Sequence, residues 1–268
     1  MVLVAILAAF GGFFITTPIQ SFVDTSRRAE LVDIADNALQ RISREMRNAL
    51  PNSVRIRTVG TSTAIEFLNT TTGGRYRARI DSGGGGEPLS GLGIDTFDAL
   101  DGVIGAINPG PAGQANCLNG NSDCLVLYNT GIGLGYFNAY NGDNIAAITA
   151  VTATTITYNN GLGWSFPFPI PPSASQRFYV VDSPISFVCD SSTGQMRRYD
   201  GYGISPVQPV PPAVAGDMLA DNVQTCIFTY APGLSSRHGL VTLEVTITDI
   251  PSAESVTLQY QVHVMNVP

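Results

Sequence analysis

The stretch that decides the fold is MVLVAILAAFGGFFITTPIQSFVDTSRRAELVDIADNALQRISREMRNAL, residues 1–50. No charge occurs in residues 1–23, and a charged segment follows from Asp24 without a break. An uncharged helix of this length, at about 1.5 Å per residue, reaches roughly 35 Å, which is enough to cross about 30 Å of membrane hydrocarbon. The sequence therefore predicts one long helical stem that runs from a membrane into water.

The second half of this stem is amphipathic. Apolar residues recur there at the i, i+3, i+4, i+7 spacing of one helix face, namely Leu31, Ile34, Ala35, Ala38, Leu39, Ile42, Met46 and Leu50. This stripe predicts packing against a downstream domain. Pro51 predicts the end of the stem, and Gly11, Gly12 and Pro18 predict weak points in its first half.

Composition limits the class of protein. The 268 residues suit a stem and one medium domain, divided as an apolar half-helix (1–23), an amphipathic half-helix (24–51) and a β-rich domain (52–268). Only 13% of the residues are charged, and every basic residue other than histidine is an arginine. The formal net charge of −7 argues against a nucleic-acid partner, because phosphate binding needs a concentrated basic surface.

Beyond the stem the hydrophobic pattern changes to period two, which is typical of β-strands. The predicted fold class is therefore α+β, with the long N-terminal helix packed on an antiparallel sheet. A meander is expected over 54–59, 63–68 and 75–80, with a turn at 72–74, and Arg75, Arg77 and Arg79 on one strand face. The other expected strands are 124–129, 144–151, 154–158, three consecutive strands within 177–200, 223–230, and a final hairpin of 240–249 with 255–265.

Four cysteines follow the stem: Cys117, Cys124, Cys189 and Cys226. An even number predicts two disulfides in an oxidising compartment, and four cysteines allow three pairings. Proximity favours Cys117 with Cys124, which leaves Cys189 with Cys226. A metal site is the weaker interpretation, because no CxxC pair occurs.

The sequence offers little for catalysis. His238 and His263 are the two histidines, and neither GxSxG nor HExxH occurs. We therefore expect no enzyme activity, no cofactor and no metal. The Asn/Asp-rich segments 119–124 and 139–145 could offer oxygen ligands to calcium, but turn chemistry explains the same residues.

A proline-rich loop at 159–176 carries three aromatic residues, Trp164, Phe166 and Phe168. Loop aromatics are frequent partner contacts, so these three are candidate contacts. Folding back onto the core of the same domain is the alternative.

Residues 1–56 together with PISFVCD (184–190), DNVQTCIFTY (221–230), GLVTLEVTIT (239–248) and SVTLQYQVHVMNVP (255–268) resemble type IV minor pilins and pseudopilins, in particular the MSHA-type minor pilins. The resemblance implies a type IV pilin-like α+β fold. It implies a subunit that helps to initiate or cap a filament, with other minor pilins, the major pilin and the inner-membrane assembly machinery as partners. The residues of the membrane and filament helix would be Met1, Val2, Leu3, Val4, Ile6, Leu7, Phe10, Gly11, Gly12, Phe13, Phe14, Ile15 and Pro18.

The resemblance also implies a location. The helix would contact membrane lipid in the inner membrane before assembly, with the domain in the periplasm, and would reach the cell surface in the pilus. The family's basic leader, glycine cleavage site, methylated phenylalanine and following glutamate do not occur in residues 1–268. We expect them upstream of Met1, because MVLVAILAAF matches the sequence expected after that glutamate.

Two other functions stay open. The first is a tip adhesin that uses loops 81–123 and 159–176. The second is a plain membrane-anchored periplasmic protein, of which an enzyme would be the least expected form.

Overall fold

The computed structural model describes residues 2–89, 94–103, 105–131, 137–159, 175–233 and 238–266; the side chains of residues 2–19 and of Ile94 lie outside this description. Within it the chain forms one long helix, two short helical turns and two antiparallel sheets. The elements are α1 (Val2–Met46), β1 (Arg55–Val59), β2 (Ser62–Arg75), β3 (Ile94–Asp98), α2 (Gln114–Leu118), β4 (Cys124–Leu127), η1 (Ala139–Asn141), β5 (Ile145–Val151), β6 (Thr155–Asn159), β7 (Arg177–Asp190), β8 (Gln195–Tyr199), β9 (Asp217–Ala220), β10 (Val223–Ala231), β11 (Gly239–Asp249) and β12 (Glu254–Val264).

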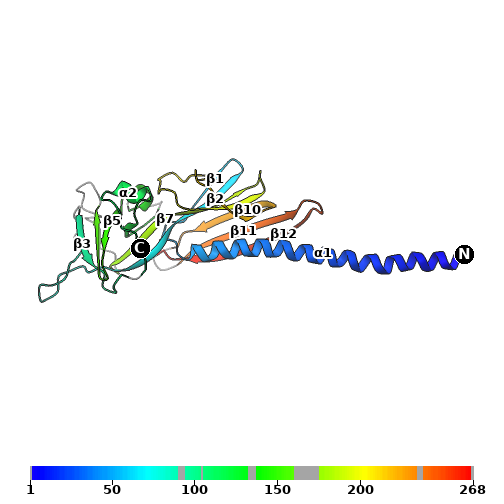
Figure 1. Cartoon of the computed structure of the whole chain (residues 1–268), viewed down its shortest axis with the longest axis horizontal. Coiled ribbons are helices and arrows are strands. Elements are labelled where there is room, and N and C mark those ends of the chain that lie inside the picture. Colours follow the sequence, from blue (N-terminus) through cyan, green and yellow to red (C-terminus); the bar gives the residue numbers. More distant parts are fainter. Residues whose placement is uncertain are drawn as a thin grey trace.

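The nine-stranded sheet is organised around β7. This strand pairs with β2 along one edge, and on its other edge with β4 through its first half and with β8 through its second half. The sheet continues from β4 through β5 and β6 to β3, and from β8 to β9. The forked arrangement separates a region next to the stem from a distal region that contains β3, β5 and α2 (Figure 1).

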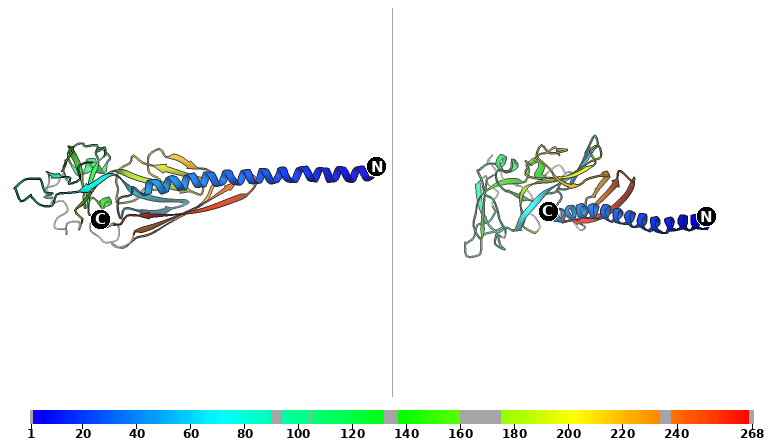
Figure 2. Two further views of the ribbon diagram at one scale, coloured as in Figure 1. Left: turned by 90° about the horizontal axis from the view of Figure 1, so that it is seen from below. Right: turned by 45° about the vertical axis from the view of Figure 1, so that its right-hand side comes forward.

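The three-stranded sheet has the order β10-β11-β12, and α1 packs mainly on β12 and β11. Figures 1 and 2 show the second half of α1 lying along this sheet while the first half projects beyond the strands. The predicted stripe is buried, with Leu31, Ala35, Ala38, Leu39, Ile42 and Met46 in one core with side chains from both sheets. This part of the sequence prediction is confirmed.

The predicted α+β, pilin-like fold class is wrong. The chain is 44% strand and 16% helix, with one N-terminal helix and large antiparallel sheets. The prediction treated the stem as a structural layer equal to the sheet, whereas the strands are longer than their sequence patterns indicated. Both β2 and β7 are 14 residues long.

The predicted turn at 72–74 and the predicted strand at 75–80 are also wrong, because β2 continues through Gly73 and Gly74 to Arg75. These glycines lie opposite Tyr179 and Phe178 of β7. A Cβ on Gly73 would lie 2.9 Å from the Phe178 carbonyl oxygen, so close strand approach explains the glycine. Similarly, the two strands expected within 177–190 are a single strand, β7.

The membrane prediction concerns residues 1–23. Among the described residues, no helix has a window that is both long and apolar enough to cross a membrane. The side chains of residues 2–19, which make up most of the predicted span, lie outside the described residues.

Candidate functional site

The first candidate site is the point where α1 leaves the domain. Residues 20–26 are exposed along the helix, and Phe22 and Val23 are 74% and 44% exposed. Large apolar side chains on an isolated exposed helix favour contact with another apolar surface. The helix is continuous from Val2 to Met46, and so passes through Gly11, Gly12 and Pro18 without a break.

Ion pairs attach the β11–β12 hairpin to the stem just below this exposed segment. Arg27 Nε lies 3.3 Å from Asp249 Oδ2, and Arg28 Nη2 lies 2.8 Å from Glu254 Oε1. About two turns further on, the Tyr260 hydroxyl of β12 donates to Asp36. The domain therefore holds the stem through side-chain contacts up to the point of emergence.

The C-terminal end of α1 is joined to the nine-stranded sheet. The amide of Leu50 donates to the Leu68 carbonyl at 2.8 Å, and the amide of Thr70 donates to the Asn48 carbonyl at 2.8 Å. Arg198 of β8 donates to Glu45 at 2.7 Å. These contacts make the second half of the stem an integral part of the fold.

Both disulfides are present, in the pairing that sequence proximity favoured. Cys117–Cys124 joins α2 to the first residue of β4. Cys189–Cys226 joins β7 of the large sheet to β10 of the small sheet. Because Cys189 belongs to the core under α1, the second bond fixes the two sheets together beneath the stem.

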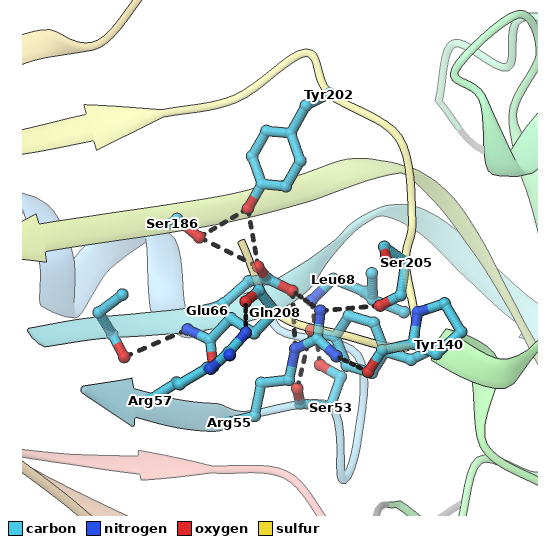
Figure 3. Close-up of polar contacts among 12 residues, drawn as sticks. Ser53, Arg55, Arg57, Glu66, Leu68, Tyr140, Ser186, Tyr202, Ser205 and Gln208 are labelled. Carbon is cyan, nitrogen blue, oxygen red and sulfur yellow. Dashed lines mark hydrogen bonds and ion pairs between the residues drawn. The ribbon is translucent and has the colours of Figure 1, made fainter. Parts of the chain in front are cut away.

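A buried ion pair, which sequence analysis missed, lies between β1 and β2 (Figure 3). Glu66 is fully buried and Arg55 is 8% exposed. Arg55 Nε donates to Glu66 Oε1 at 2.9 Å, and its two Nη groups donate to the carbonyls of Ser205 and Pro206 at 2.9 Å each. Each buried charge thus has a partner, as a low-dielectric interior requires.

The other Glu66 oxygen accepts from two hydroxyls, Tyr202 at 3.0 Å and Ser186 at 3.2 Å. Burial, reinforced by the Glu66 charge, raises the pKa of Tyr202 above its usual value. The Arg55 guanidinium also stacks over the Tyr140 ring, 3.5 Å from its centroid, and burial raises the pKa of Tyr140 well above its usual value. These contacts hold the 202–206 connection against the β1–β2 hairpin.

One sequence signal could have indicated this cluster. Glu66 is the single charged residue of the strand TAIEFL, 63–68, between Ile65 and Phe67, which are both buried. A lone acid within an otherwise buried strand needs a basic partner. Its partner could not be identified from the sequence, because many arginines were available.

Several predicted site residues cannot be placed. Trp164, Phe166 and Phe168 lie outside the described residues, as do the side chains of the predicted filament helix from Met1 to Pro18. The expected arginine face is not formed, since β2 ends at Arg75 and Arg77 pairs with Asp98 at 2.8 Å.

The Asn/Asp-rich segments 119–124 and 139–145 both contain hydrogen-bonded turns, in which the Gly120 amide donates to the Cys117 carbonyl at 3.0 Å and the Gly142 amide donates to the Ala139 carbonyl at 3.2 Å. Asn138 caps η1 through the Tyr140 amide, and Asp123 accepts from the Asn108 amide at 2.9 Å. Burial raises the Asp123 pKa above its ordinary value. In the part of the chain with described side chains, no group of three or more His, Cys, Asp or Glu residues is arranged to hold a metal ion.

Both histidines lie near the β11–β12 pair. His238 precedes β11 and is exposed. His263 of β12 lies opposite Leu240 of β11 and is also exposed.

No protein-family model, no curated protein and no solved structure matches this chain.

Proposed function

We propose that the chain is a minor subunit of a type IV pilus-type filament and helps to initiate or cap its assembly. The observation that carries the proposal is α1 itself. Its second half is part of the domain core, and its first half projects from the domain with Phe22 and Val23 exposed. An apolar helix of this kind gains stability by packing with other helices or with lipid.

The sequence resemblance to minor pilins supports the same proposal. In it, the projecting helix lies in the inner membrane before assembly and among the helices of other subunits afterwards. The domain lies on the periplasmic side, where its two disulfides form. The domain acts as a structural module and not as an enzyme.

Several contacts attach the stem to the domain and join its two sheets. Four such connections lie along the stem-proximal core: the ion pairs Arg27–Asp249, Arg28–Glu254 and Arg198–Glu45, and the disulfide between the sheets. A rigid connection between helix and sheets suits a subunit whose position in an array is fixed by its helix.

The test is the content of surface filaments in the organism that produces the chain. Deleting the gene should reduce the number of filaments, and mass spectrometry of purified filaments should detect peptides from residues 52–268 at low abundance. A normal filament number, together with the absence of these peptides from filaments, would contradict the proposal. Normal filament number with lost surface attachment would instead favour the tip-adhesin alternative.

A further inference from the structure

A groove of about 460 Å³ lies between α1 and β12. The helix contributes Ser43 and Arg44, the turn that follows it contributes Arg47, and the strand contributes Tyr260 and Val262. The volume falls within the range of sites that bind a ligand or a side chain of a partner. The groove lies on the half of the stem that the domain holds in place.

The groove carries unsatisfied hydrogen-bond donors. Ser43 is 8% exposed, and its Oγ has no hydrogen-bond partner among the described residues. A buried polar atom without a protein partner is rare, and a polar group of a bound partner would satisfy it. Arg44 and Arg47 are exposed, and within the described part of the chain neither forms an ion pair.

Nearby acids do not neutralise these arginines. Asp36 accepts from the Tyr260 hydroxyl and from Gln40 at 2.6 Å. Glu45 is paired with Arg41 at 3.1 Å and with Arg198 at 2.7 Å. The groove is therefore a basic, donor-rich site in a protein of net charge −7, and its complement is a pair of carboxylates.

The stem carries such a pair at a matching spacing. Glu30 and Asp33 are exposed, and neither forms an ion pair within the described residues. Glu30 lies 14 residues before Arg44, and Asp33 lies 14 residues before Arg47. For Glu30 and Arg44, which both lie in α1, this separation is about 3.9 helical turns, so the two side chains lie on nearly the same face, roughly 21 Å apart along the axis. Arg47 follows directly after the last residue of the helix.

We propose that the Glu30 and Asp33 carboxylates of one copy bind in the Arg44–Arg47 groove of a second copy displaced by roughly 21 Å along parallel stems. The occupant of the groove is thus a second copy of this chain. Such a contact uses two different surfaces of the chain, so it joins the two copies head to tail. The inference rests on the proposed function, because it assumes that the stems pack side by side.

The test is charge reversal in the full chain, measured in detergent by energy transfer between copies that carry a donor or an acceptor fluorophore at the C-terminus. The acid-reversed variant is Glu30→Arg/Asp33→Arg, and the groove-reversed variant is Arg44→Glu/Arg47→Glu. Each variant alone places like charges together and should weaken self-association roughly tenfold or more. A mixture of the two restores opposite charges at every contact and should return association to near the wild-type value.

The control is Arg79→Glu, which reverses an exposed arginine outside the stem and should leave association unchanged. Recovery in the mixture shows that both variants fold, so a loss in the single variants cannot come from misfolding. If both reversals leave association unchanged while deletion of residues 1–23 abolishes it, this charge register is overturned and the proposed function stands. If deletion of residues 1–23 does not weaken wild-type association, both the inference and the stem-packing basis of the proposed function are overturned.

Discussion

Replacing Glu66 with glutamine should destabilise the domain strongly. Glu66→Gln keeps the size of the side chain and removes its charge, which leaves the buried Arg55 guanidinium with neutral partners alone, among them the carbonyls of Ser205 and Pro206 and the ring of Tyr140. Removal of one partner from a buried ion pair costs about 3–5 kcal/mol. For a chain of this size that loss corresponds to a melting temperature lower by roughly 10 °C.

The assay is equilibrium urea unfolding followed by circular dichroism, with the free energy of unfolding as the readout. Glu254→Gln is the matched control, because its partner Arg28 is largely exposed and the loss should be about 1 kcal/mol or less. Replacing both members of the buried pair, as in Arg55→Met/Glu66→Leu, should cost less than Glu66→Gln alone, since no unpaired charge is left. A Glu66→Gln loss as small as that of Glu254→Gln would refute the reasoning.

Three further predictions concern stability and are measured by the same unfolding assay. Leu39→Ala removes a fully buried stem residue and should cost about 2–5 kcal/mol. Loss of the bond between Cys189 and Cys226, which are 37 residues apart, should cost about 4 kcal/mol on the chain-entropy model. Because the pKa of Tyr202 is raised in the folded state, the hydroxyl ionises at lower pH in the unfolded state, and the free energy of unfolding falls above pH 10. Tyr202→Phe should remove this contribution, which is about 1.4 kcal/mol per pH unit.

Each of these predictions has a result that would contradict it. A Leu39→Ala loss below about 1 kcal/mol would mean that the stem is not part of the core. A reduced and alkylated chain as stable as the oxidised one would exclude a stabilising bond between the sheets. An unchanged alkaline slope in Tyr202→Phe would mean that its hydroxyl is not buried against Glu66.

The stem was predictable because its signal is local. The spacing from Leu31 to Met46 identifies a buried helix face without knowledge of any other element, and the structure confirms it. The Cys117–Cys124 bond was favoured for a related reason, since the two cysteines are only seven positions apart in the sequence.

The sheet layout was not predictable, because it depends on pairing between distant segments. The sequence pattern of Gly73 and Gly74 predicts a turn, yet both residues belong to β2. There they are approached closely by Phe178 and Tyr179 of β7, which are more than 100 residues away in the sequence. The Arg55–Glu66 cluster depends on Tyr202, Ser205 and Pro206 in the same way. Its lone buried acid was visible in the sequence, but the residues that satisfy it were not.

The most direct test of the proposed role of the stem is a comparison of two chains in the producing organism, the full chain and a chain that starts at residue 24. The stem-proximal core begins at Leu31, so the shorter chain should keep the same unfolding midpoint when a secretion signal delivers it to the periplasm. We predict that the full chain is recovered in sheared surface filaments and that the shorter, folded chain is absent from them. Equal recovery of both chains in filaments would contradict the role of the projecting helix.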